Sequence, residues 1–176
     1  QSAQLVDQVG RSVRFEEFTR GRASLVAFFY SRCDNPRKCS ALIARMAVLQ
    51  ARLLAEGRDV CIACITYDPA FDTPARLKAY GEARGFRFGD EHRFFSALDH
   101  QALRSAMKLR VGYAASVVSV HRTELFVLDA SGAPVAQNAR DGFTDDDVIS
   151  TLAALAAAPA LTRTGGASAL CVASAA

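Results

Sequence analysis

Short apolar runs alternate with stretches of helical periodicity through the first half of the chain. Residues 24–30 are almost wholly apolar, which is typical of a strand inside a sheet. Across 40–56 the apolar residues recur at helical spacing, which predicts an amphipathic helix that Gly57 ends. The buried stripe of this helix consists of Leu42, Met46, Leu49 and Leu53. A second buried strand is expected over 59–66.

Turn and cap residues predict a hairpin before the strand–helix–strand segment 24–66 and helices after it. The alternation within 4–15 indicates a small N-terminal hairpin. Thr73 as a cap and Pro74 in the first turn predict a helix that Gly85 stops. Another helix is expected over 99–108.

The last part of the pattern is a hairpin followed by a helix. Strands are expected over 125–128 and 134–137, and Thr144 caps a final helix whose first-turn aspartates suit the helix dipole. Beyond this helix small residues dominate and periodicity is lost. We therefore expect one domain over 1–158 and a disordered tail over 159–176.

This order of elements predicts the fold class. Alternating strands and helices imply an α/β fold in which helices cover a sheet. A closing antiparallel hairpin and a final helix favour a thioredoxin-like layout, with a central mixed β-sheet flanked by helices and an N-terminal β-hairpin. The 176 residues, 51% of them hydrophobic and 22% charged, suffice for one well-cored globular domain.

The balance of charge and the hydropathy of the sequence argue against two classes of protein. The formal net charge is +3, from 21 basic and 18 acidic residues, and no basic stripe with interleaved aromatics is present. This argues against nucleic-acid binding. No apolar stretch of the sequence is long enough to cross a membrane.

Two cysteines carry the most informative candidate chemistry. Cys33 follows the first buried strand, and Cys39 directly precedes the amphipathic helix. A helix N-terminus favours the thiolate, and Arg32, Arg37 and Lys38 add positive charge, so we expect one of the two thiols to be ionised near neutral pH. The pair can serve as a disulfide or as two ligands of one metal ion.

A histidine completes a donor set for copper. His121 ends the apolar run 116–120 and precedes the strand expected over 125–128, whose start faces the cysteine loop in thioredoxin-like folds. Two thiolates and an imidazole are ligands that a soft copper ion prefers. His92 and His100 have no such context, and we expect both to be solvated.

The remaining cysteines are expected to be structural or incidental. Cys61 and Cys64 lie three apart within a strand and therefore point to opposite faces, which argues against a redox pair or a zinc site. We expect both to be buried and inert. Cys171 lies in the expected tail.

Several acidic residues are weaker candidates. Asp68 follows the end of a strand, where we expect it mainly to form a turn; the alternative is that it orients a ligand or a basic side chain near the cysteine loop. Asp72 and Glu124 are further candidates without an assigned role. The cluster of four aspartates lacks the spacing of a calcium loop and is interpreted as charge at a helix start. Its members are Asp141, Asp145, Asp146 and Asp147.

These motifs resemble the Sco/SenC family of thioredoxin-like copper-binding proteins. The resemblance covers about 5–155 and rests on 28–33, on 65–80 and on His121 with the strand after it. It implies that Cys33, Cys39 and His121 bind one copper ion, as Cu(I) or Cu(II). It also implies a role in assembling the copper centre of cytochrome c oxidase, as a metallochaperone or a thiol reductant. Family members act in the bacterial periplasm, often behind a membrane anchor.

Two departures from the family pattern keep alternatives open. Five residues separate Cys33 from Cys39 where the family normally has three, and Val120 stands where an aspartate is common before the histidine. The longer loop favours disulfide exchange, whereas the histidine favours metal. The alternatives to copper delivery are a metal-independent thiol–disulfide oxidoreductase that uses both cysteines, and a degenerate Sco-like binding or sensor domain.

Overall fold

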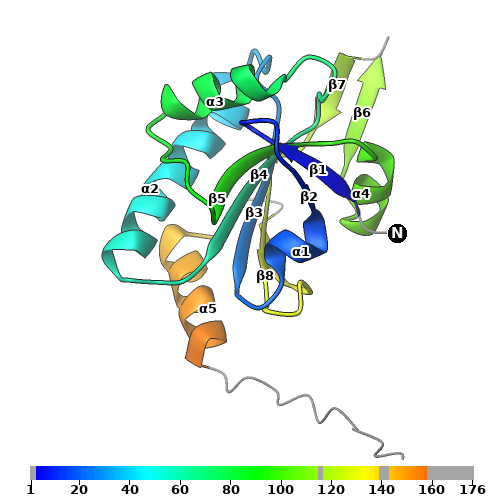
Figure 1. Cartoon of the computed structure of the whole chain (residues 1–176). Helices are drawn as coiled ribbons and strands as arrows, with labels where there is room; N and C mark the ends of the chain where they lie inside the picture. Colours follow the sequence, from blue (N-terminus) through cyan, green and yellow to red (C-terminus); the bar gives the residue numbers. More distant parts are fainter. Residues whose placement is uncertain (1–2, 115–116, 139–142, 158–176) are drawn as a thin grey trace, which may run out of the picture.

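The computed structural model describes residues 3–114, 117–138 and 143–157, and it has a mixed seven-stranded sheet at its centre (Figure 1). The strands of this sheet are β1 (Gln4–Asp7), β2 (Ser12–Arg14), β3 (Ser24–Phe29), β4 (Cys61–Thr66), β5 (His92–Ala97), β8 (Glu124–Leu128) and β9 (Pro134–Asn138). Their order across the sheet is β2-β1-β5-β4-β3-β8-β9. A separate antiparallel pair is formed by β6 (Val111–Ala114) and β7 (Val117–His121).

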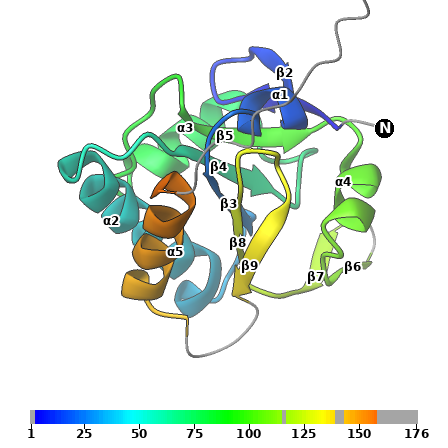
Figure 2. The ribbon, with the colours of Figure 1, turned by 90° about the horizontal axis from the view of Figure 1, so that it is seen from below.

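Helices cover both faces of the sheet. They are α1 (Phe15–Thr19), the π-helical turn η1 (Pro36–Ser40), α2 (Ala41–Ala55), α3 (Pro74–Glu82), α4 (His100–Ala106) and α5 (Asp145–Ala157). In Figure 2, α2 and α5 lie on one side of the sheet, and α4 lies on the other with β6 and β7. None of the helices described is long and apolar enough to cross a membrane.

The parallel strands β3 and β4 are buried along their whole length because their side chains are almost all apolar. β3 pairs in parallel with β4 and antiparallel with β8, so that Phe28 lies between Ile65 and Glu124. The ends of β3 and β4 and the start of β8 therefore share one edge of the sheet, and the cysteine loop follows directly from that edge. This α/β architecture with a mixed central sheet confirms the predicted fold class.

The structure differs from the sequence predictions in two strand regions. His92 was expected in a solvated loop, yet it begins β5, where the apolar pair Phe94 and Phe95 is too short to show a clear strand pattern. The pairing of β6 with β7 was not predicted either. Thr73 occupies the N-cap of α3 but makes no side-chain capping bond. The tail predicted over 159–176, with Cys171, lies outside the described residues.

Candidate metal centre

The loop between the two cysteines contains an extra turn that places Cys39 next to Cys33. Asn35 caps this turn by accepting a hydrogen bond from the Arg37 amide at 3.0 Å. The backbone is kinked within η1, where Lys38 has φ −106° and ψ −106°. A five-residue spacer is thereby accommodated without separating the thiols, and Cys39 enters the core at the start of α2 with 1% of its surface exposed.

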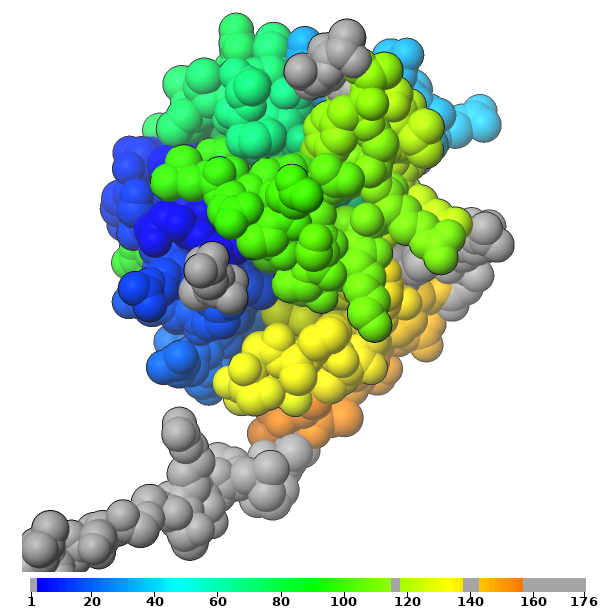
Figure 3. Space-filling model, turned by 90° about the vertical axis from the view of Figure 1, so that its right-hand side faces the viewer, coloured from blue at the N-terminus to red at the C-terminus, as the bar shows by residue number. Residues whose placement is uncertain are grey.

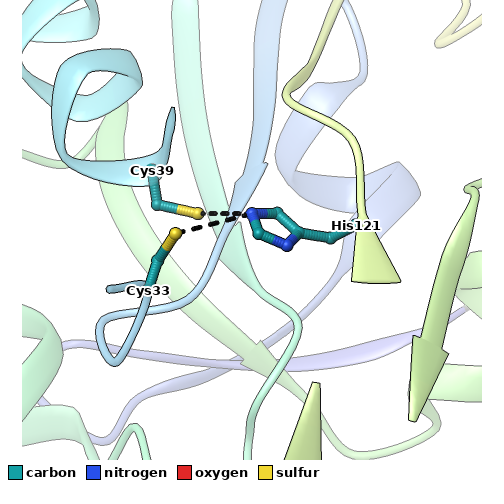
Figure 4. A group of neighbouring side chains, drawn as sticks. All are labelled: Cys33, Cys39 and His121. Carbon is teal, nitrogen blue, oxygen red and sulfur yellow. Dashed lines mark hydrogen bonds between the residues drawn. The ribbon is translucent and has the colours of Figure 1, made fainter. Parts of the chain in front are cut away.

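The three predicted donor side chains converge. The Nε2 atom of His121 lies 3.6 Å from the Sγ atom of Cys33 and 3.3 Å from that of Cys39 (Figure 4). All three donor atoms lie within 4.8 Å of one another. Figure 3 shows the loop that carries the cysteines beside the β6–β7 hairpin at one end of the molecule.

This spacing fits a metal ion. Thiolate and imidazole bonds of about 2.0–2.3 Å, as for zinc, hold three donors around one ion about 3.3–4.0 Å apart. The two sulfur–nitrogen distances lie within that range. Two sulfurs and one imidazole nitrogen are soft to borderline donors, a combination that suits copper better than calcium or magnesium.

The His121 imidazole lies between two tyrosines, in surroundings that favour its neutral form. His121 ends β7, and only 8% of its surface is exposed. Its ring centroid lies 4.9 Å from that of Tyr30 and 6.1 Å from that of Tyr67. Burial lowers the pKa of His121, and the positive charge of Lys38 lowers it further. The imidazole therefore keeps a lone pair available at neutral pH.

Burial has the opposite consequence for Cys39. It raises the pKa of the Cys39 thiol to about 12, and the opposing effect of Lys38 is smaller. The cations that were expected to keep one of the two thiols ionised therefore do not do so at Cys39, because removal from water outweighs one solvated charge. A bound metal ion would replace the proton and stabilise the thiolate. Cys33 is the more exposed of the two thiols.

Asp68 forms a turn, the role mainly expected of it, since its carbonyl accepts from the Phe71 and Asp72 amides. Its side chain orients Arg32 beside the cysteines. It is 3% exposed and accepts hydrogen bonds from Nε and Nη2 of Arg32, the former at 2.9 Å. The guanidinium of Arg32 also lies 4.2 Å from the centre of the Phe71 ring. Arg32 is therefore directed toward Asp68 and Phe71.

Asp72 fastens the start of the cysteine loop to the end of β4. The carboxylate is fully buried and accepts a hydrogen bond from the Ser31 amide at 3.1 Å. It also accepts hydrogen bonds from the hydroxyls of Ser31 and Thr66. Because Ser31 is two residues before Cys33, this aspartate fixes where the loop begins.

Glu124 forms a buried pair with Tyr67 behind His121. The Tyr67 hydroxyl donates to the Glu124 carboxylate at 2.7 Å, and the two residues are 0% and 1% exposed. Tyr30 and Tyr67, which line the imidazole, were not singled out from the sequence. The available signal was that each follows a buried strand that ends at the same edge as the cysteine loop.

The other two histidines are half-buried, contrary to the prediction that they are solvated. Nδ1 of His92 lies 2.9 Å from the side-chain amide nitrogen (Nε2) of Gln50, and Nε2 of His92 lies 3.2 Å from the backbone carbonyl oxygen of Val60. Nε2 of His100 lies 3.2 Å from the Tyr113 hydroxyl. Packing against neighbouring elements, which the local sequence does not reveal, accounts for both differences.

The other cysteines and the aspartates do not form a second site in the described residues. Cys61 and Cys64 are buried as predicted, with 3% and 0% of their surfaces exposed. Asp145 and Asp146 pair with arginines of α2, and Asp147 bonds Thr144. Asp141 lies outside the described residues. Among those that are described, the single cluster of three or more potential metal ligands is that of Cys33, Cys39 and His121.

Comparison with known proteins identifies the family. The SCO1/SenC family model matches residues 2–157. The chain belongs to the SCO1/SenC family. Within this family, the SCO1 protein homolog of Bacillus subtilis (strain 168) is 34% identical over 74 residues, which are 42% of this chain and 37% of that protein.

Solved SCO1/SenC structures share the fold. A family lipoprotein from Bacillus anthracis str. Ames matches with a TM-score of 0.76 and 20% identity, over 89% of this chain and 94% of that chain. BsSco, described as having a disulfide switch, matches with a TM-score of 0.75 and 23% identity, over 89% and 92%. Yeast Sco1 with copper bound matches with a TM-score of 0.69 and 17% identity, over 92% and 90%.

Proposed function

We propose that this SCO1/SenC protein binds one copper ion through Cys33, Cys39 and His121 and delivers it to the copper-site subunit of a cytochrome c oxidase. The observation that carries the proposal is the convergence of two sulfurs and one imidazole nitrogen from distant parts of the chain within 4.8 Å. The donor chemistry and the copper-bound yeast relative support the choice of metal.

The unequal exposure of the thiols suggests how the cargo enters and leaves. Cys33 is half-exposed and Cys39 is buried, so an incoming copper donor or acceptor meets Cys33 first. Cys39 and His121 complete coordination from the inner side. On delivery a ligand of the acceptor also meets Cys33 first, and it replaces Cys33 while the inner ligands Cys39 and His121 still hold the ion.

Family relatives support a proposal for the partner and the compartment. BsSco is described as a member of the Sco family of cytochrome c oxidase assembly proteins, and the Bacillus anthracis relative is a lipoprotein. An oxidase subunit that receives copper outside the cytoplasm is therefore the proposed acceptor. We propose a periplasmic location, or a membrane-anchored one that faces the periplasm.

Thiol–disulfide exchange is the second candidate function. The two sulfurs are close enough for a small movement to join them, and BsSco is described as having a disulfide switch. In this reaction both thiols lose a proton and an electron each, an S–S bond forms between them, and a disulfide of the partner is reduced to two thiols. The same loop therefore supports either role.

Copper titration of the fully reduced protein tests the leading proposal. Wild type should bind one Cu(I) per chain in competition with a chromophoric chelator, and the Cys33→Ala, Cys39→Ala double variant should bind none tightly. Cys61→Ala is the matched control, because it removes a buried cysteine outside the cluster. Equal copper stoichiometry in wild type and the double variant would refute the proposed site. A redox function without copper would instead leave wild type unable to compete with the chelator.

A further inference from the structure

The histidine of the candidate copper site lies on a hairpin that forms a two-stranded sheet of its own. β6 and β7 pair with each other, with Val111 opposite His121, and form a sheet separate from the seven-stranded one. The two cysteines, by contrast, lie on a loop that follows β3 and leads into α2. The site is therefore assembled from two parts, and something other than strand pairing must fix their relative position.

Three hydrogen bonds hold this hairpin, two to residues at the end of the main sheet and one from α4. The Tyr113 hydroxyl donates to the backbone carbonyl of Tyr67 at 2.7 Å. The Arg110 amide, at the start of β6, donates to Oε1 of Glu124 at 3.3 Å. A guanidinium nitrogen of Arg104 donates to the Val111 carbonyl at 2.8 Å. Two of these three bonds end on the buried Tyr67–Glu124 pair.

Burying the Glu124 carboxylate costs free energy unless its oxygens accept hydrogen bonds. Glu124 is 1% exposed, and its carboxylate contacts the Tyr67 hydroxyl and the Arg110 amide. A buried carboxylate is tolerated when its oxygens accept hydrogen bonds. Here one oxygen accepts from the Tyr67 hydroxyl and the other from the Arg110 amide, so one side chain joins β4, β6 and β8.

We infer that Tyr67 and Glu124 are positioning residues for His121: they hold the hairpin so that the imidazole Nε2 faces both sulfurs. Tyr67 contributes twice, because its ring also packs against the imidazole. The consequence for copper rests on the proposed function. Loosening the anchor leaves the two thiolates in place and removes the imidazole, so it should weaken Cu(II) far more than Cu(I), which two thiolates can hold.

Tyr67→Phe and Tyr113→Phe test the inference, since each removes a phenol hydroxyl and keeps the ring. Cu(II) affinity should fall at least about tenfold, the scale of one lost buried hydrogen bond, while Cu(I) affinity stays within about twofold. A tenfold change in this ratio raises the one-electron copper potential by about 59 mV. Nitrogen coupling in the Cu(II) electron paramagnetic resonance spectrum should weaken in parallel. Tyr80→Phe is the matched control, because Tyr80 stacks on Phe29 and has no bond to the hairpin among those described.

Glu124 variants should give a graded response. Glu124→Gln keeps one acceptor oxygen and should lie between wild type and Glu124→Ala in Cu(II) affinity. A residue that merely supports folding would lower the melting temperature and both copper affinities together. Equal losses of Cu(I) and Cu(II) affinity, or none, would overturn the inference.

A double variant separates positioning from every other effect. In a His121→Ala background, adding Tyr67→Phe should change Cu(II) affinity no further, because both substitutions remove the same interaction. Additive losses would contradict a shared role. If wild type binds no copper, the inference is tested on the metal-free protein by the imidazole NMR signals. Tyr67→Phe should shift or broaden those of His121 and leave those of His92 unchanged, and unchanged His121 signals would overturn it.

Discussion

Asp72 offers a direct test of how the cysteine loop is fastened. Asp72→Asn keeps the size of the side chain but replaces an acceptor oxygen with an NH2 group that cannot accept. The three hydrogen bonds from Ser31 and Thr66 then lose their charged acceptor inside the core, and the one that meets the NH2 group survives only if the Ser31 hydroxyl turns to accept. Losing a buried hydrogen bond to a charged group costs about 1.5–3 kcal/mol. For a domain of this size each 1 kcal/mol lowers Tm by about 2–4 °C, so we expect a decrease of about 3–12 °C.

The assay is thermal unfolding followed by circular dichroism at neutral pH. Asp34→Asn is the matched control, because Asp34 is an exposed acid of the same loop, and its Tm should stay within about 2 °C of wild type. A second readout is local: alkylation of Cys39, which is 1% exposed, should become faster in Asp72→Asn well below its Tm. If both variants melt and react like wild type, the proposed fastening of the loop is wrong.

Three further predictions concern oxidation, pH and packing. Under mild oxidation Cys33 and Cys39 should pair while Cys61 and Cys64 stay reduced, and a dominant Cys61–Cys64 bridge in peptide maps would contradict this. Burial lowers the pKa of His100 from 6.5 to about 4, so as pH falls the unfolded state takes up this proton first, and folding stability should be lost between pH 6.5 and about pH 4. The Tm of His100→Gln should therefore fall less than that of wild type between pH 7 and pH 5. Equal decreases in Tm would contradict this prediction. Gly81→Ala should lower the free energy of unfolding by about 1–3 kcal/mol, although alanine favours a helix, because the added Cβ would lie 2.6 Å from the Phe88 ring. Gly89→Ala, which has open space around the added Cβ, should lower it much less, and urea unfolding of the two variants measures the difference.

The predictions rested on two kinds of sequence signal: a period or run that extends over a whole element, and cap or turn residues such as Thr73 and Pro74 at the start of α3. The helix with the Leu42 and Met46 stripe and the strand around Phe28 were found because each pattern extends over the whole element. β5 was missed because its burial depends on strands on both sides rather than on its own sequence. Local pattern thus predicted the elements whose own residues show which side is buried, and it missed the strand whose burial depends on its neighbours.

The candidate site was predictable in residue type but less so in electrostatics. Cys33, Cys39 and His121 could be chosen because few other side chains supply soft donors at the expected edge of the sheet. The state of the Cys39 thiol was not predictable, since it depends on an extra turn that carries the side chain into the core. Tyr67 and Glu124 are joined across 57 positions of sequence, a contact that periodicity cannot reveal.

The full burial of Cys64 gives the protein an internal reporter of its own unfolding. This thiol lies in the central strand β4, opposite Ala27 on one side and Phe94 on the other. A thiol reagent reaches it only when the sheet opens, so its labelling rate at low reagent concentration follows the opening equilibrium, in the way that protected amides exchange with solvent. Cys33, at the surface, reacts from the folded state. Site-resolved labelling of one sample therefore reports at once the accessibility of the candidate copper centre and the free energy that keeps the fold closed around it.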